Sequence, residues 1–301
     1  MEPCEICPRL CRVDRVSRMG FCRAGEVPSV ARAALHFWEE PPISGTRGSG
    51  AVFFSGCNLR CVFCQNGEIS AHIKGAPKNA EELAQIYLRL ESQGAHNINL
   101  VTPTPHSLVV ADSMERARAK GLKIPFVWNS SAYERVETLR RLEGLVDIYL
   151  PDLKYSSDLP AKKYSAAPDY CSIAEAALKE MWRQCGPLLV DGGGVAVKGV
   201  LVRHLLLPRG VENARRVVDA LTDWFGGGEK GAALSLMRQY TPMHRVLSEP
   251  QKFAAIARRV TPLEYDRAAQ YAMDAGISQL WLQGKEAASS EFTPPFNGEG
   301  T

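Results

Sequence analysis

The sequence predicts an α/β fold: a partial (β/α)6 barrel of the TIM type, preceded by a short cysteine-rich metal-binding module. Two observations lead to this prediction. Six short apolar segments alternate with helical patterns, as expected for parallel strands with helices outside them. Seven of the nine cysteines gather at 4–22 and 57–64, which indicates metal or iron–sulfur ligation rather than a scattered core. A doubly wound open sheet is the alternative arrangement.

Size and charge limit the class of protein. The 301 residues are 45% hydrophobic, which is enough for a sizeable core, and barrels of this length form one unit. The net charge of +3 is too balanced to predict a nucleic-acid partner, and no apolar run is long enough to span a membrane. The first residues, 1–4, lack the pattern of a signal peptide. We therefore expect a cytoplasmic protein, and disulfides are rare in that compartment.

The chain divides into four predicted segments. Residues 1–25 form the cysteine-rich module, and residues 26–50 form a connector. Residues 51–284 form the partial barrel. The polar tail, 285–301, is either an ordered strap over the surface or loosely held.

The barrel elements follow from local patterns. Asn79 begins a helix with a capping box, and Thr261 begins another with a first-turn proline. The stretch 211–225 has an apolar face, and 161–185 is helical with a break at Pro168. The predicted strands are short and rich in β-branched or aromatic residues; they are 51–55, 97–102, 124–129, 146–152, 198–207 and 233–239.

The central cysteine motif follows directly on the first predicted strand. Cys57, Cys61 and Cys64 have the spacing C-x3-C-x2-C, which lets one tight loop hold three corners of a [4Fe-4S] cluster. The missing fourth cysteine leaves one iron open, and an open position separates a catalytic metal site from a structural one. A structural zinc site is the alternative, with His72 as the nearest fourth ligand at an unusual spacing.

A second group of cysteines lies in the N-terminal module. Cys4, Cys7, Cys11 and Cys22 supply four ligands in a stretch too short to build its own core, so a bound metal is expected to organise it. Zinc and a second iron–sulfur cluster both fit the spacing. A structural role and a role in electron relay or substrate binding both remain open.

The chain resembles the radical S-adenosylmethionine superfamily, and within it the family related to pyruvate formate-lyase activating enzyme. The central cysteine motif, with Phe63 before its last cysteine, is the most specific part of this likeness. The other motifs that carry it are Cys4–Cys11, Ser44–Gly50, Asn97–Thr104, Val127–Ser131, Pro151–Tyr155, Val202–His204 and Gln239–Pro242. The resemblance implies a [4Fe-4S] cluster and S-adenosylmethionine, and it favours a second iron–sulfur cluster at the N-terminal cysteines.

Cofactor-binding residues are expected at the strand ends, where the active sites of barrels lie. Thr102 and Thr104 stand where relatives often have Gly-Gly-Glu, so their hydroxyls and nearby carbonyls are expected to bind the cofactor's amino group. A Thr-Pro turn is the structural alternative there. Phe63 is expected to pack against the adenine, with a plain core aromatic as the alternative.

Later strand ends supply the remaining candidates. Asn129 and Ser130 are expected to bond the ribose, unless they only form a turn. Lys154 is expected to pair with the methionine carboxylate while Asp152 orients it, with a surface ion pair as the alternative. Alternation along the strand sends Arg203 and His204 to opposite faces, and Arg203 is the one expected to face the site, where it could meet a carboxylate or the ribose.

The resemblance implies an oxidoreductase that reductively cleaves S-adenosylmethionine to a 5′-deoxyadenosyl radical, which then abstracts a hydrogen atom. A glycine in a partner enzyme is the leading substrate, which would make the chain a glycyl-radical-enzyme activase. A peptide or a small molecule is the alternative. A low-potential donor such as flavodoxin or ferredoxin would supply the electron. The absent Gly-Gly-Glu leaves a third possibility, a non-catalytic iron–sulfur or metal-binding protein.

Overall fold

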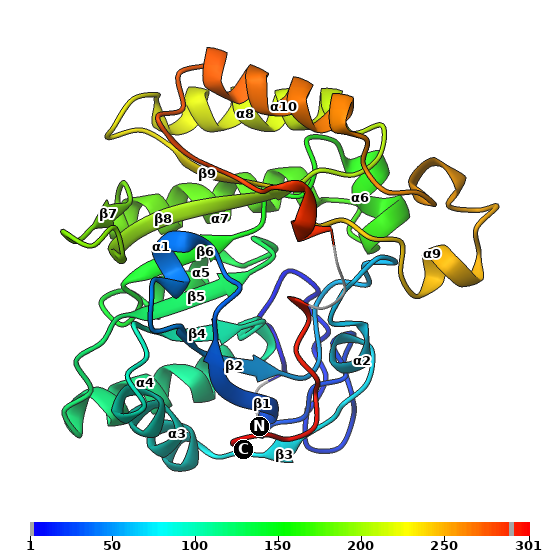
Figure 1. Cartoon of the computed structure of the whole chain (residues 1–301). Helices are drawn as coiled ribbons and strands as arrows, with labels where there is room; N and C mark the ends of the chain where they lie inside the picture. Colours follow the sequence, from blue (N-terminus) through cyan, green and yellow to red (C-terminus); the bar gives the residue numbers. More distant parts are fainter. Residues whose placement is uncertain (1–2, 289–291) are drawn as a thin grey trace.

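The computed structural model describes residues 3–288 and 292–301 and contains a mostly parallel sheet wrapped by helices (Figure 1). The strand order is β10-β9-β8-β6-β5-β4-β2-β1-β3, and β7 pairs with β8. Seven strands run parallel, whereas β1 runs antiparallel to β2. The strands are β1 (Ser29–His36), β2 (Ser49–Phe54), β3 (Ala76–Pro77), β4 (Ile98–Val101), β5 (Phe126–Ser130), β6 (Ile148–Pro151), β7 (Leu189–Val190), β8 (Ala196–Leu205), β9 (Ala233–Met237) and β10 (Gln279–Leu282).

The helices occupy the predicted connections. Figure 1 shows α3 and α4 together at one end of the sheet and α8 and α10 together at the other, and each pair is in contact. The helices are α1 (Pro41–Ser44), α2 (Gly67–Ser70), α3 (Ala80–Ser92), α4 (Ser107–Ala119), α5 (Val136–Arg140), α6 (Asp158–Ser165), α7 (Tyr170–Cys185), α8 (Val211–Phe225), α9 (Arg245–Ser248) and α10 (Pro262–Asp274), with short 3-10 turns at Thr104–His106, Ala254–Ile256 and Lys285–Ala287. In the described ranges, no helix has the length and apolar character needed to cross a membrane.

The predicted partial barrel is confirmed. All six predicted strands are present as β2, β4, β5, β6, β8 and β9, and they lie side by side in chain order. Both predicted capping boxes form, at Asn79 on α3 and at Thr261 on α10. The break at Pro168 falls between α6 and α7. The sequence did not predict β10, which adds a seventh parallel strand at one edge.

The predicted connector, 26–50, is more structured than expected. It contains β1, which pairs with β2 from Val30 to His36, and α1, whose Ile43 is fully buried. Ile43 packs with Val127, Ile148 and other apolar residues on the inner face of the sheet. The connector therefore contributes Ile43 to the apolar interior of the partial barrel.

Residues 292–301 of the predicted C-terminal tail form an ordered strap over the surface. The amide of Gly298 donates to the carbonyl of Ala31 over 3.1 Å, and that of Ala33 donates to the carbonyl of Glu299 over 2.8 Å. Phe296 packs edge-on against Phe53 of β2, with ring centroids 5.5 Å apart. These contacts hold the tail along β1.

Candidate active site

One pocket gathers every candidate residue that the sequence placed in the barrel. It lies at the carboxyl ends of the parallel strands, which meet at the same edge of the sheet. Residues from the tail also line it. The predicted residues on its wall are Cys57, Cys61, Phe63, Cys64, Thr102, Thr104, Asn129, Ser130, Asp152, Lys154 and Arg203.

The cysteine loop between β2 and α2 is fixed by backbone bonds. The amides of Arg60 and Val62 donate to the carbonyls of Ser165 and Tyr164, which ties the loop to the end of α6. Gly56 begins the loop with φ +87°, a conformation that favours glycine, and a Cβ there would lie 2.8 Å from the Cys22 carbonyl oxygen. The loop can therefore take this path only because residue 56 lacks a side chain.

All three central thiols are free and half-buried, and each sulfur has a hydrogen-bond partner. The amide of Leu59 donates to Cys57 Sγ over 3.4 Å, and the hydroxyl of Ser70 donates to Cys64 Sγ over 3.4 Å. Cys61 Sγ lies 3.0 Å from the Ser165 hydroxyl. Burial, followed by the nearby thiols of Cys61 and Cys64, raises the pKa of Cys57, and burial raises the pKa of Cys61 to about 11.

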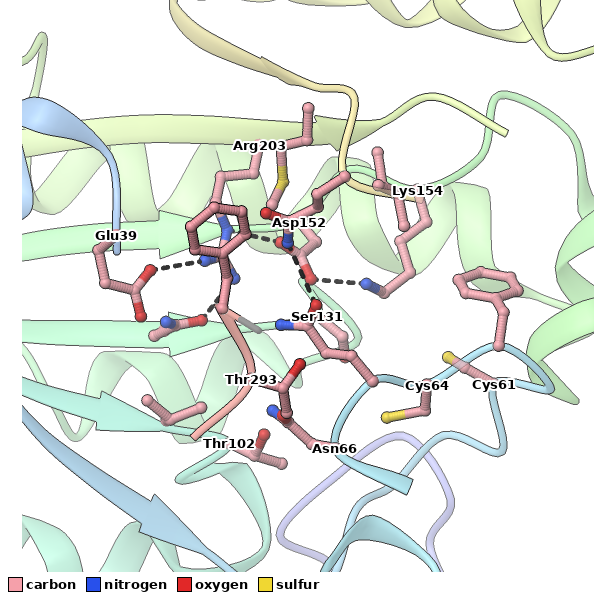
Figure 2. Close-up of a pocket in the computed structure, with 18 of the residues that line it drawn as sticks. Glu39, Cys61, Cys64, Asn66, Thr102, Ser131, Asp152, Lys154, Arg203 and Thr293 are labelled. Carbon is pink, nitrogen blue, oxygen red and sulfur yellow. Dashed lines mark hydrogen bonds and ion pairs between the residues drawn. The ribbon is translucent and has the colours of Figure 1, made fainter. Parts of the chain in front are cut away.

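A network of charged side chains forms the opposite wall (Figure 2). Arg203 Nε donates to Asp152 Oδ1 over 2.7 Å, and its other nitrogens reach Glu39 over 3.2 Å and Asn129 Oδ1 over 2.6 Å. Lys154 Nζ donates to Asp152 Oδ2 over 2.6 Å. The side chains of Asp152 and Lys154 are only 21% and 15% exposed, so this is a pocket pair rather than the surface ion pair considered from sequence.

The charges in this network follow from burial and pairing. Burial opposes ionisation of Asp152, but the cations Arg203 and Lys154 outweigh it and lower the pKa of the carboxyl. Burial raises the pKa of Glu39 and of Glu40 more than Arg203 lowers it. His204 points away from the pocket, as predicted, and bonds to the carbonyl of Leu153 over 2.7 Å.

Two threonines follow the end of β4, Thr102 directly and Thr104 at the start of a 3-10 turn. Thr102 has φ +61°, a left-handed conformation that is rare for a β-branched residue, and it lines the pocket. The hydroxyl of Thr104 donates to Glu134 Oε1 over 2.7 Å, and the indole of Trp128 donates to the same oxygen over 3.1 Å. Thr104 therefore presents only its acceptor capacity to a ligand.

Sequence reasoning missed several residues of the pocket and its support. Glu39 and Glu40 were overlooked because 26–50 was treated as a connector, although two acidic residues after an apolar segment were a visible signal. Glu134 carries no motif and is recognised only through its contacts. Phe292, Thr293 and Pro294 of the tail line the pocket because of a tertiary contact that no local pattern encodes.

The four N-terminal cysteines also lie together. Cys4, Cys7, Cys11 and Cys22 line one small cavity, and all four thiols are free. Arg9, within this module, donates to the carbonyl of Asn58 in the central cysteine loop over 2.8 Å. Among residues 3–288 and 292–301, no three His, Cys, Asp or Glu side chains converge on a position for a single metal ion.

Comparison with known proteins identifies the superfamily. A family model described as the Radical SAM superfamily matches residues 51–179. The chain is 30% identical over 287 residues to the uncharacterized protein MJ0674 of Methanocaldococcus jannaschii, covering 92% of this chain and 76% of that protein. This chain belongs to the radical S-adenosylmethionine superfamily. Its identity to a second protein of the same organism, the uncharacterized protein MJ0808, is 25% over 205 residues, which covers 60% of this chain and 55% of that protein.

Two solved structures are also similar to this chain. A domain of pyruvate-formate lyase-activating enzyme from Bacteroides vulgatus is 13% identical, with a TM-score of 0.44, and the match covers 60% of this chain and 94% of that domain. HydG, a maturase of the [FeFe]-hydrogenase, is 13% identical, with a TM-score of 0.48, and the match covers 75% of this chain and 48% of HydG.

Membership of the radical S-adenosylmethionine superfamily implies a [4Fe-4S] cluster and S-adenosylmethionine, and the pocket's donor set fits both. Three thiols on one loop suit three irons and leave the fourth for a ligand. Near them, Asn66 Oδ1 and Thr241 Oγ1 line the pocket and have no hydrogen-bond partner among the described residues. Buried polar atoms normally have partners, so these two acceptors suit a polar ligand beside the cluster.

Proposed function

We propose that this chain is a radical S-adenosylmethionine enzyme that cleaves its cofactor at a cluster held by Cys57, Cys61 and Cys64. The observation that supports this most strongly is the convergence of these free thiols with eight predicted cofactor-binding residues on one pocket. The reduced cluster, when bound, supplies the electron that breaks a C–S bond of S-adenosylmethionine, and the resulting 5′-deoxyadenosyl radical abstracts a hydrogen atom from the substrate.

The protein's own residues bind and orient the cluster and S-adenosylmethionine. The hydrogen bonds that Leu59 and Ser70 donate to the sulfurs of Cys57 and Cys64 stabilise these residues as thiolate ligands, as donors to metal ligands do at other metal centres. Lys154 offers an ammonium for the cofactor's carboxylate, held in place by Asp152. Phe63 supplies an apolar face for the adenine and packs edge-on against Tyr240 at 5.8 Å. Phe292, Thr293 and Pro294 of the tail line the pocket, where they would help to exclude water once the cofactor is bound.

Three substrate classes fit this chemistry. A glycine Cα–H of a partner enzyme is suggested by the resemblance to the activating enzyme. A peptide is the second class and a small molecule the third. The strap along the pocket favours the small molecule, because a protein loop would have to displace Phe292–Pro294 to enter.

The proposal includes a metal at Cys4, Cys7, Cys11 and Cys22, with a second iron–sulfur cluster preferred over zinc. Its support is that the four thiols share one cavity and that Arg9 and Gly56 join the module to the central loop. An auxiliary cluster in this position would lie beside the central one and could pass an electron to it from a low-potential donor such as flavodoxin or ferredoxin.

The test is anaerobic cofactor cleavage. Wild type is loaded with iron and sulfide, reduced with dithionite and given S-adenosylmethionine, and 5′-deoxyadenosine is measured. We expect product from wild type and from the control Cys171→Ala, and none above background from Cys57→Ala, Cys61→Ala or Cys64→Ala. Undiminished product from any of these three would contradict the ligand assignment. Iron and zinc counts identify the N-terminal metal, since two clusters hold about eight irons per chain and one holds about four.

A further inference from the structure

The side of the pocket that contains Glu39, away from Cys61 and Cys64, has a distinct chemistry. In Figure 2, Glu39 lies on the opposite side of the Arg203–Asp152 pair from Cys61 and Cys64. The wall there includes Trp38, Glu39 and Glu40, which come from the segment between β1 and α1. We call these three residues and Phe292 of the tail the acidic end of the pocket. It is separate from the thiols, where the cofactor's methionine is expected to bind.

Carboxyl groups outnumber basic side chains in the pocket. Three carboxyl side chains line it, from Glu39, Glu40 and Asp152, against the two cations Lys154 and Arg203. Asp152 is paired with both cations, and Glu39 accepts from Arg203 and from Asn99 Nδ2, the latter over 3.0 Å. Glu40 is close enough to Arg203 for its charge to act on it, but it makes no ion pair within 4.0 Å among the described residues.

Glu40 also has an unused acceptor. The residue is only 6% exposed, and it lines the pocket. Its Oε2 has no hydrogen-bond partner among the described residues, and the same is true of Oδ1 of Asn99, the residue that bonds to Glu39. A buried acceptor without a donor is costly, so this oxygen indicates a ligand that brings one.

The aromatic rings beside the carboxyls favour a positive charge. Trp38 and Phe292 line the pocket with their ring centroids 4.9 Å apart. The negative faces of aromatic rings attract cations, and carboxylates next to such rings are a common setting for ammonium groups. The nearby His36 does not compete, because burial lowers its pKa to about 4 and keeps it neutral.

We propose that the acidic end binds the protonated amine of a small-molecule substrate, with Glu40 Oε2 accepting a hydrogen bond from the ammonium and Trp38 facing its charge. This rests on the proposed function, since it places the substrate's amine beyond the cofactor and leaves its reacting carbon between the acidic end and the cluster. Glu40 and Trp38 then select substrates by charge.

The test measures binding rather than turnover. Cluster-loaded protein with S-adenosylmethionine bound is titrated calorimetrically with n-butylammonium and, separately, with the uncharged n-butanol. We expect n-butylammonium to bind at least about tenfold more tightly than n-butanol, as for one hydrogen bond to a charged group. Glu40→Gln should weaken n-butylammonium binding at least about tenfold, and Trp38→Leu about threefold to tenfold. The control Glu137→Gln, an exposed carboxyl outside the pocket, should change nothing.

Several results would overturn the proposal. Equal binding of the amine and the alcohol, or an unchanged affinity in Glu40→Gln, would show that the acidic end does not recognise an ammonium. Binding that appears only when S-adenosylmethionine is absent would assign the site to the cofactor's own ammonium. Trp38 is 62% exposed, so the Trp38→Leu variant is expected to fold even if Glu40→Gln, at a buried residue, does not. Because no cleavage is measured, failure here is separate from failure of the radical chemistry.

Discussion

Asp152 and Arg203 are joined by backbone as well as by side chains. The amide of Leu153 donates to the carbonyl of Arg203 over 2.9 Å, next to the 2.7 Å ion pair between Arg203 Nε and Asp152 Oδ1. The two residues form an isolated bridge beyond the end of β6. The charge pair is thus held by the sheet itself, and the sheet should survive the loss of the charge.

Asp152→Asn is therefore expected to fold and to bind S-adenosylmethionine poorly. The change leaves Lys154 without its carboxylate partner, so the ammonium that should meet the cofactor is no longer oriented. Affinity should fall about tenfold or more, as for loss of a hydrogen bond to a charged group. Equilibrium dialysis with labelled cofactor measures this, with the exposed Asp266→Asn as control. An unchanged affinity would remove Asp152 and Lys154 from the cofactor site.

Gly56→Ala is expected to disturb the cysteine loop. The added Cβ would lie 2.8 Å from the Cys22 carbonyl oxygen, in a backbone conformation with φ +87°. Strain of this kind costs about 1–3 kcal/mol, so the loop should shift and retain less iron. Iron per chain after reconstitution is the readout. Gly25→Ala is the matched control, since a Cβ there meets nothing within 4 Å; equal iron in the two variants would argue against the contact.

Glu134→Ala is expected to destabilise the ends of β4 and β5. It leaves the Thr104 hydroxyl and the Trp128 indole without their acceptor, at about 1–3 kcal/mol for each buried group. Urea unfolding measures the loss. Glu134→Gln keeps a carbonyl oxygen in the same place, so it should restore most of the stability. Equal losses in the two variants would show that an uncharged acceptor of the same size cannot replace the carboxyl, and would contradict the view that the two hydrogen bonds to Oε1 are what support the strand ends.

The start of α10 supplies a pH-dependent contribution to stability. The Arg258 guanidinium, assisted by the amide of Thr261, holds the pKa of Glu264 well below its usual range. A carboxyl with a lowered pKa stabilises the fold above its unfolded-state pKa, and the effect is lost as the pH falls toward the folded-state pKa. Glu264→Gln should lower stability at pH 7 by about 1 kcal/mol, the usual contribution of a cap.

Thermal unfolding of wild type and Glu264→Gln between pH 7 and pH 3 tests this. The gap in Tm should be constant near neutrality and close below the ordinary pKa of a glutamate. A gap that stayed the same at pH 3 would show that the ionised form of Glu264 is not what stabilises α10.

The parts of this fold that sequence could predict are those with a local physical cause. Strands such as β5, buried on both faces, read as short apolar runs, and the helix starts at Asn79 and Thr261 follow from their own side chains. The two-residue strands β3 and β7 are too short to leave a pattern. β10 is only half-buried, so its apolar signal was weak.

The same distinction applies to the site. The central cysteines and the strand-end residues, from Thr102 to Arg203, were predictable because parallel strands bring their carboxyl ends together. Glu39 and Glu40 reach the pocket only because β1 folds back onto β2, and Phe292 only because the tail pairs with β1. These contacts join residues far apart in the chain, and no local pattern in the sequence records them.

The residues of the pocket are separated by very different lengths of chain, and this affects the order in which their contacts form during folding. The central thiols lie within eight residues of one another, so a loop can gather them at small entropic cost. The contact between Glu39 and Arg203 closes a separation of 164 residues through a parallel sheet, and such non-local contacts form slowly. The cysteine loop can therefore meet iron in a chain whose charged wall has not yet formed. We therefore expect the charged wall, which includes Glu39 next to the proposed amine site, to be completed late in folding.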